Sequence, residues 1–210
     1  LADGEVEGAD QQKDFLRIVH EETDRLARLV DNMLDISRIE AGVAQAHRSD
    51  VDLGVLAERV VASMRPHADE RSIDLVLRAR THTLKVEGDE DMLGEVLENL
   101  ISNAVKYTPE GGRVVVSIDP DGLTSSIVAT VTDTGLGIPP DDLEKLFDKF
   151  YRISRHEREV RGTGLGLNLC RNIVEEVHHG RIGVDSTLGM GSRFWFSVPV
   201  KYSGAGAAAA

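Results

Sequence analysis

Apolar residues recur at helical spacing over the first part of the chain. Between residues 10 and 41 they lie three or four positions apart, with acids and arginines between them: Phe15, Ile18, Val19, Leu26, Leu29, Val30, Met33, Leu34, Ile36 and Ile39. Gly42 follows as a helix stop signal. The pattern predicts one long amphipathic helix. Its apolar stripe needs a partner helix, because a single helix cannot bury such a stripe alone.

The pattern changes after a polar connector at residues 43–52. A second helix is predicted from Leu53 to about Ala68. Beyond it, β-type alternation predicts strands at residues 72–80, 84–89, 112–119, 126–133, 181–186 and 192–200. Helical spacing predicts helices at residues 89–107, 141–147 and 164–178. Residues 152–162 form a charged loop, and residues 203–210 are a low-complexity tail or a leftover of expression. The plan is a helical segment followed by an α+β domain of about 150 residues.

Composition excludes several classes of protein. A net charge of -12 argues against nucleic-acid binding, which needs clustered Lys and Arg. No apolar run approaches the roughly 20 residues that span a bilayer, and no signal-peptide pattern opens the chain. Cys170 is the only cysteine, which suits a reducing compartment. We therefore expect a cytoplasmic chain without direct membrane contact. Its abrupt beginning favours a piece of a larger protein, which is either soluble or anchored in a membrane.

A polar stripe crosses the helix predicted at residues 89–107. Glu95, Asn99, Asn103 and Lys106 share one face of a helix that is apolar elsewhere. The stripe is either a solvated surface or a site in which an amide oxygen meets hydrated Mg²⁺ and the ammonium group meets a phosphate. Taken alone, the stripe favours the solvated surface.

Two glycine-containing segments follow. Asp133 ends a predicted strand and precedes Gly135 and Gly137, which is either an ordinary turn or a carboxylate that accepts a hydrogen bond from a purine amino group. The second segment, residues 162–177, leads into an apolar helix. Its backbone N–H groups can face an anion, and the charged loop before it has the composition of a mobile lid or of a solvated loop. The glycines of this segment are Gly162, Gly164 and Gly166.

The order of these motifs is more specific than any one of them. N-x-x-x-N-A-x-K-Y, D-x-G-x-G, F-x-x-F-Y-R and G-x-G-x-G-L follow one another, and together they resemble the catalytic core of the sensor histidine kinases of two-component systems. The resemblance covers nearly the whole chain, because residues 26–42 look like the second helix of that family's dimerisation domain and residues 186–200 like its closing strands.

The resemblance implies a fold and a domain plan. The fold is a Bergerat-type α/β sandwich, with a mixed sheet under a helical layer, preceded by a long dimerisation helix. Residues 1–48 would be a partial dimerisation domain with the second helix only, residues 49–202 the ATP-binding catalytic domain and residues 203–210 the tail.

The resemblance also implies a role for each motif residue, with ATP and Mg²⁺ as cofactors. Asn103 would bind Mg²⁺ with Asn99 beside it, and Lys106 and Arg152 would contact phosphates. Asp133, with Gly135 and Gly137 beside it, would recognise the adenine amino group. Tyr107 would lie against the nucleotide. Phe147 and Phe150 would anchor the base of the lid. The end of the lid near the phosphates would be formed by Gly162, Thr163, Gly164, Leu165 and Gly166.

The family's phosphoacceptor motif, a histidine followed by an acid and then Arg-Thr-Pro or similar, does not occur in the sequence. His20 is followed by Glu-Glu-Thr-Asp and belongs to the second dimerisation helix. We therefore expect Mg-ATP binding without autophosphorylation. The expected function is transfer of the γ-phosphoryl group to a histidine of the dimerisation domain, for relay to a response-regulator aspartate. The expected partners are the chain's own dimerisation domain, a second kinase protomer and a response-regulator receiver domain.

Two other functions remain open from the sequence. One is a serine kinase of the anti-sigma type, which the long first helix and the F-x-x-F-Y-R motif argue against. The other is a pseudokinase scaffold, which the intact Asn103, Asp133 and glycines argue against. A gyrase-type ATPase is disfavoured, because Asn99 stands where that group has a general-base glutamate.

Overall fold

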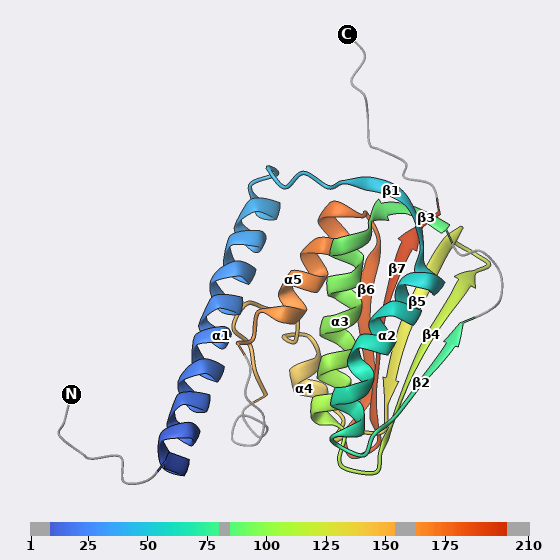
Figure 1. The fold of residues 1–210 in the computed structure, drawn as a ribbon. Helices are drawn as coiled ribbons and strands as arrows, with labels where there is room; N and C mark the ends of the chain where they lie inside the picture. Colours follow the sequence, from blue (N-terminus) through green and yellow to red (C-terminus); the bar gives the residue numbers. More distant parts are fainter. Residues whose placement is uncertain (1–8, 80–84, 154–162, 201–210) are drawn as a thin grey trace.

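The long amphipathic segment forms one helix, α1 (Ala9–Glu40), which lies beside the rest of the molecule (Figure 1). The computed structural model describes residues 9–79, 85–153 and 163–200. After α1 the order is β1 (Arg48–Asp52), α2 (Leu53–Asp69), β2 (Asp74–Ala79), β3 (Lys85–Asp89), α3 (Glu90–Tyr107), β4 (Arg113–Asp121), β5 (Ser126–Asp133), α4 (Pro140–Leu143), α5 (Gly166–Asn172), the π-helical turn η1 (Ile173–Val177), β6 (Arg181–Thr187) and β7 (Gly191–Pro199).

Five strands form one mixed sheet in the order β2-β4-β5-β7-β6. Only β2 and β4 are parallel, and the other neighbours are antiparallel. A separate two-stranded sheet joins β1 to β3, with Val51 opposite Val86. This small sheet attaches the segment after α1 to the start of α3.

The helices α2, α3 and α5 cover one face of the sheet (Figure 1). Phe194, Phe196 and Val198 of β7 point into this interface and are buried, while Trp195 and Ser197 between them are half-buried. This alternation is the one that the sequence predicts for a half-solvated strand. Burial of each large apolar side chain stabilises the fold by about 1.5–3 kcal/mol. The buried face of α3 consists of Leu93, Val96, Leu97, Leu100, Ile101, Ala104 and Val105.

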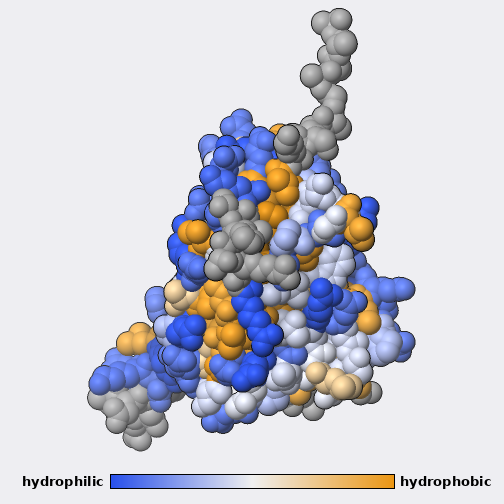
Figure 2. Space-filling model, turned by 90° about the vertical axis from the view of Figure 1, so that its right-hand side faces the viewer, coloured by the Kyte–Doolittle hydropathy of each residue, from blue (hydrophilic) through white to orange (hydrophobic). Residues whose placement is uncertain are grey.

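The side of the molecule that is on the right in Figure 1 is mainly hydrophilic, and its apolar residues surface in several separate patches (Figure 2). The described helices include none that is long and apolar enough to cross a membrane.

Among the described residues of α1, the buried ones lie in its C-terminal half, where the rest of the molecule covers the helix. Ile36 and Ile39 are buried, and Leu29 is half-buried, where α1 meets α5 and η1. Glu40, the last residue of α1, accepts a hydrogen bond from the Lys149 ammonium group at 2.8 Å. The remaining apolar stripe of α1 is exposed: Phe15, Leu16, Ile18, Val19, Leu26, Val30, Met33 and Leu34.

The predicted elements are present, with three differences in detail. The polar connector contains β1, whose single buried residue is Val51. The helix predicted at residues 141–147 is a single turn, Pro140–Leu143, followed by non-helical turns. The helix predicted at residues 164–178 begins at Gly166 and widens into the π-helical turn η1 before His178.

Candidate functional site

The polar stripe of α3 faces a cavity. Asp89 caps the N-terminus of α3 by accepting a hydrogen bond from the Met92 N–H, and this fixes where the helix begins. The apolar residues of α3 then face the sheet, so Asn99 and Asn103 fall on the opposite, half-buried side. The Asn99 amide group donates to the Glu95 carbonyl oxygen at 3.1 Å, so its own oxygen points away from that bond.

Asp133 is held at the end of β5 by two backbone groups. Its Oδ1 accepts hydrogen bonds from the N–H of Gly135 at 2.8 Å and the N–H of Ser192 at 3.2 Å. Among the described residues both bonds end on Oδ1, which leaves Oδ2 for a donor on a ligand. Burial raises the pKa of Asp133, and the two N–H groups partly oppose this rise. The carboxylate is therefore oriented as a hydrogen-bond acceptor at the cavity wall.

The glycines after Asp133 are required by close backbone contacts. A Cβ on Gly135 would lie 2.6 Å from the Tyr107 carbonyl oxygen. Gly137 has a φ of +65°, and a Cβ there would lie 2.0 Å from the Thr187 carbonyl oxygen. Only glycine fits these positions without displacing backbone. The turn after β5 thus packs tightly against the C-terminus of α3 and the β6–β7 hairpin.

Both ends of the loop predicted as a lid meet at one point. The Phe150 N–H donates to the Gly164 carbonyl oxygen at 2.9 Å, and Gly164 has a φ of +72° against the Phe150 backbone. Phe150 itself adopts a φ of 62°, a strained value for a bulky residue. Beyond it, a Cβ on Gly166 would lie 2.6 Å from the Asn99 Oδ1, so the start of α5 lies directly against α3.

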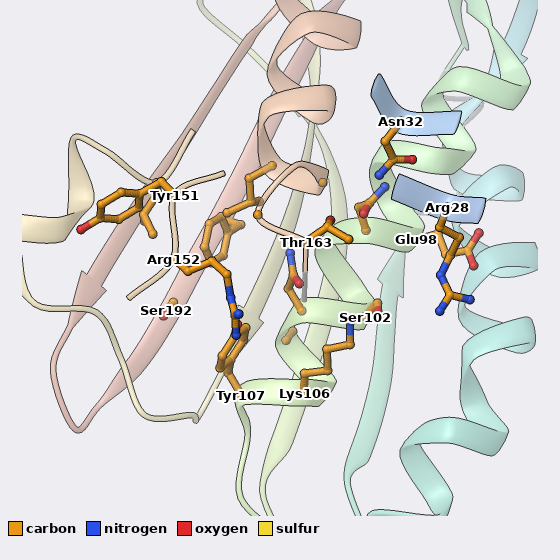
Figure 3. Close-up of a pocket in the computed structure, with 18 of the residues that line it drawn as sticks. Arg28, Asn32, Glu98, Ser102, Lys106, Tyr107, Tyr151, Arg152, Thr163 and Ser192 are labelled. Carbon is orange, nitrogen blue, oxygen red and sulfur yellow. The ribbon is translucent and has the colours of Figure 1, made fainter. Parts of the chain in front are cut away.

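These elements enclose one cavity of about 820 Å³, within the range of small-molecule sites. Figure 3 shows Lys106 and Ser102 on α3, Arg152 and Thr163 from the two ends of the lid, and Tyr107 at the end of α3. Apolar side chains near Asp133 complete the wall: Ile138, Leu146 and Phe194. A flat heterocycle fits between such apolar walls, and the amide and cationic groups suit a phosphate chain and its metal ion.

Most of the site residues named from the sequence line this cavity. They are Asn99, Asn103, Lys106, Tyr107, Asp133, Gly137, Arg152, Thr163, Gly164 and Gly166. Gly135 and Leu165 are buried behind the wall and shape it from outside. Phe147 is buried, whereas Phe150 is 56% exposed and does not line the cavity. Gly162 lies outside the described residues.

The cavity also has walls that sequence reasoning missed. Five residues of α1 line it, although they read as the solvated face of an amphipathic helix: Glu22, Arg28, Asp31, Asn32 and Asp35. The i, i+3, i+4 and i+7 spacing of the last four is the only signal in the sequence, and any polar helix face shows such spacing. Which of these residues meets α3 depends on tertiary packing.

Burial and neighbouring charges shift the ionisation of the α3 residues. Partial burial lowers the pKa of Lys106, and the Arg28 guanidinium lowers it further. Burial raises the pKa of Glu95, and Asp35 and Glu98 add to this rise. Burial raises the pKa of Tyr107, while Arg152 acts in the opposite direction.

The described residues contain no group of three or more His, Cys, Asp or Glu side chains that could hold a metal ion. A metal in this cavity would therefore rest on few protein ligands. Mg²⁺ is commonly bound in this way, through one or two side-chain oxygens together with phosphate oxygens and water. The half-buried Asn103 amide offers one such side-chain oxygen at the cavity wall, so the residues present fit a Mg²⁺ ion that arrives with a nucleotide.

Two family models match the chain. The model of the histidine kinase-, DNA gyrase B- and HSP90-like ATPases matches residues 88–202, and that of the His Kinase A (phospho-acceptor) domain matches residues 1–42. The sensor histidine kinase WalK of Bacillus subtilis (strain 168) is 36% identical over 96% of this chain, which covers 33% of WalK. The sensor protein SrrB of Staphylococcus aureus (strain MRSA252) is 34% identical over 95% of the chain and 34% of SrrB. The chain thus spans about a third of the length of these relatives.

Solved structures show the same fold. Full-length ShkA in complex with AMPPNP is 29% identical, with a TM-score of 0.78 over 91% of this chain and 39% of ShkA. The histidine kinase ThkA in complex with the response regulator protein TrrA is 26% identical, with a TM-score of 0.71 over 95% of this chain and 53% of that chain. Together with the mixed sheet under its helical layer, these likenesses confirm the predicted Bergerat-type sandwich.

Proposed function

Because this chain belongs to the sensor histidine kinases of two-component systems, we propose that it binds Mg-ATP in the cavity beside α3 and transfers the γ-phosphoryl group to a histidine of a dimerisation domain. A response-regulator aspartate would then receive the phosphoryl group. One observation carries the proposal: the carboxylate of Asp133, the amide of Asn103 and the cations Lys106 and Arg152 all line the same cavity.

The side chains divide into a base-recognition end and a phosphate end. Asp133 accepts a hydrogen bond from the adenine amino group through Oδ2. The base lies between the apolar walls, beside the close-packed turn of Gly135 and Gly137. Tyr107 lies against the nucleotide. Asn103, with Asn99 beside it, holds Mg²⁺, which neutralises phosphate charge. Phosphoryl transfer depends on positioning and charge neutralisation more than on covalent help from the protein.

Lys106 and Arg152 supply the positive charge that the transferred group needs. The lowered pKa of Lys106 reflects its partly buried place in the cavity, where a charged hydrogen bond to phosphate is stronger than in water. Arg152 lies at the first end of the lid, and Thr163, Gly164 and Gly166 lie at the second. Phe147, buried below the lid, anchors its base, and Phe150 fixes the two ends together through its bond to Gly164.

The proposed domain plan is a partial dimerisation domain over residues 1–48, a catalytic domain over 49–202 and a tail over 203–210. The boundary after residue 48 falls at the first residue of β1, and the pairing of β1 with β3 supports assigning the chain from this strand onward to the catalytic domain. The exposed apolar stripe of α1 supports pairing with the other dimerisation helix and with a second kinase protomer. The ThkA relative is solved with a response regulator, which supports a receiver domain as partner. We place the protein in the cytoplasm, where its single, buried Cys170 stays reduced.

The relatives do not favour the serine-kinase or scaffold functions, because they are sensor histidine kinases. No observation in the cavity favours either alternative.

Nucleotide binding to Asp133→Asn tests the proposed site. Asparagine keeps the size of the side chain and a carbonyl oxygen for the Gly135 and Ser192 N–H groups, but it places an NH₂ group where Oδ2 accepted. A lost hydrogen bond to a charged group costs about 1.5–3 kcal/mol, so we expect ATP to bind about ten- to a hundredfold more weakly. Titration calorimetry with ATP and GTP measures this, and the preference for ATP should shrink.

The matched control is Asp185→Asn. Asp185 is an exposed acid of β6 that pairs with Arg193 at 3.1 Å and does not line the cavity. Its substitution should leave the Kd for ATP within about twofold of the parent. Equal Kd values for the parent and Asp133→Asn would show that the nucleotide-site assignment is wrong.

A further inference from the structure

The helix α1 forms one wall of the cavity. Its residues Arg28, Asp31, Asn32 and Asp35 line the same space as Asn99 and Lys106 of α3. Figure 3 shows Arg28 and Asn32 leaving α1 toward α3, with Arg28 and Lys106 extending toward one another. The dimerisation helix thus contributes side chains to the catalytic cavity.

The two helices run antiparallel at this wall (Figure 1). Arg28, early in the facing part of α1, acts on Lys106, late in α3. Asp35, one heptad further along α1, acts on Glu95, eleven residues earlier in α3. This register places Arg28 opposite Lys106 toward the Tyr107 end of the cavity and Asp35 opposite Glu95 toward its other end. The cavity is also lined by the acids Glu22, Asp31 and Glu98.

Two like charges that face the same cavity repel one another, and partial burial increases the free-energy cost of keeping both groups charged. Arg28 and Lys106 therefore form a cationic pair in a chain whose net charge is -12. An anion between them turns this repulsion into attraction. A nucleotide polyphosphate is such an anion, and the cavity that Arg28 and Lys106 share is the one with the proposed base-recognition and metal-binding groups.

We propose that Arg28 of α1 is a nucleotide-binding residue, which contacts the polyphosphate of ATP together with Lys106 and makes the dimerisation helix part of the nucleotide site. This inference rests on the proposed function. It also couples two events: a nucleotide that contacts Arg28 holds α1 against the catalytic domain, and a docked α1 strengthens nucleotide binding by the same factor.

Charge and geometry predict how nucleotides differ. A triphosphate carries more negative charge than a diphosphate, so loss of Arg28 should weaken the binding of ATP more than the binding of ADP. Arg28→Lys keeps the charge but not the planar fork, and should recover part of the loss. The matched control is Arg17→Ala, which removes the same charge from the same helix. Arg17 is exposed beside Asp14 and does not line the cavity.

The experiment measures Kd for Mg-ATP and Mg-ADP by titration calorimetry on the whole chain and the three variants. We expect Arg28→Ala to raise the Kd for Mg-ATP by about tenfold. Arg28→Lys should raise this Kd by less, and Arg17→Ala by less than about twofold. If the parent binds Mg-ATP and Arg28→Ala matches Arg17→Ala with both nucleotides, the inference is overturned and the proposed function stands. If the parent binds no Mg-ATP, the proposed function itself fails, and this inference fails with it.

Discussion

His178 is a buried histidine whose hydrogen bonds require the neutral ring. Its Nε2 accepts from the Asp89 N–H at 3.0 Å, so its Nδ1 must be the nitrogen that donates to the Ile173 carbonyl oxygen at 2.8 Å. From the sequence, a histidine pair at residues 178–179 is expected to favour a helix end by its positive charge. The helix does end there, but His178 acts as a neutral link between η1 and the start of α3.

Burial lowers the pKa of His178 below its ordinary value of 6.5, against the hydrogen bond to the Ile173 carbonyl oxygen, which raises it. Arg48 and His179 act in the same direction as burial, and Asp89 acts in the opposite one. Below about pH 6.5 the unfolded chain takes up a proton here that the folded chain does not. The contribution of the neutral His178 ring to the free energy of unfolding is therefore fully present above about pH 6.5 and is lost as the pH falls. We expect the free energy of unfolding to fall by up to about 1.4 kcal/mol per pH unit from this group.

Urea unfolding between about pH 7 and pH 5 measures this slope. His178→Gln removes the titrating group, so its unfolding free energy should depend less on pH than that of the parent. Glu95 and Asp133, whose raised pKa values act with the opposite sign, are present in both chains and cancel in the comparison. The matched control is His20→Gln, at an exposed histidine of α1 that is not among the groups acting on His178, and this variant should keep the parent's slope. A parent and a His178→Gln variant with the same slope would contradict the assignment.

The helix α1 has two apolar surfaces with different partners. Ile36 and Ile39 pack against the catalytic part and are 3% and 7% exposed, whereas Leu34 is 50% exposed. The Glu40–Lys149 ion pair adds to the contact at the end of the helix, although a half-exposed pair contributes only about 0–1 kcal/mol. The buried isoleucines therefore dominate the docking of α1.

Ile36→Ala should release α1 from α5 while the catalytic fold stays intact. Loss of a buried isoleucine side chain costs about 2–5 kcal/mol, which exceeds what the ion pair supplies. Amide hydrogen exchange of α1, compared with that of α3, measures the effect: exchange should accelerate in α1 alone. Leu34→Ala on the exposed stripe is the control and should leave both helices unchanged. Equal exchange of α1 in the two variants would show that this contact does not hold the helix.

Elements with strong apolar periodicity could be predicted from the sequence. The first helix was expected at residues 10–41 and is found at Ala9–Glu40, and β5 lies where its alternation places it, at Ser126–Asp133. Strand β1 could not be predicted, because Val51 is its only buried side chain and its register comes from β3. The π-helical turn depends on one extra residue accommodated before His178, which leaves no mark on the apolar pattern.

At the scale of the molecule, the site combines local motifs with one long-range wall. The order of the motifs sufficed to name residues that line one cavity. Asp133 ends β5 and Gly166 begins α5, and both elements pack against α3, which carries the first motif. The α1 wall depends on how a separate helix docks, and no local pattern encodes that. Phe150 marks the same limit: its side chain is 56% exposed and does not line the cavity, and the bond from its N–H to the Gly164 carbonyl oxygen is a tertiary contact that no local pattern encodes.

Under the proposed function, this chain meets its acceptor histidine on another dimerisation helix, because its sequence contains no acceptor motif and α1 leaves an apolar stripe exposed. We expect the chain alone to bind Mg-ATP without labelling any of its seven histidines. A dimerisation domain that carries the family's acceptor histidine should become labelled when it is mixed with this chain and γ-labelled ATP. The exposed stripe of α1 is the proposed surface for pairing of the two helices.

Acid-labile, base-stable label on the added domain measures transfer to histidine. Asn103→Ala, which removes the proposed Mg²⁺ ligand, should abolish the label, whereas Arg17→Ala should retain it, because that residue is outside the cavity. Label on a histidine of this chain would contradict the expectation that its own histidines are not acceptors. Acid-stable label on a serine would instead support the serine-kinase alternative. The phosphoamino acid that carries the label thus separates the two kinase functions, which share the same ATP-binding fold.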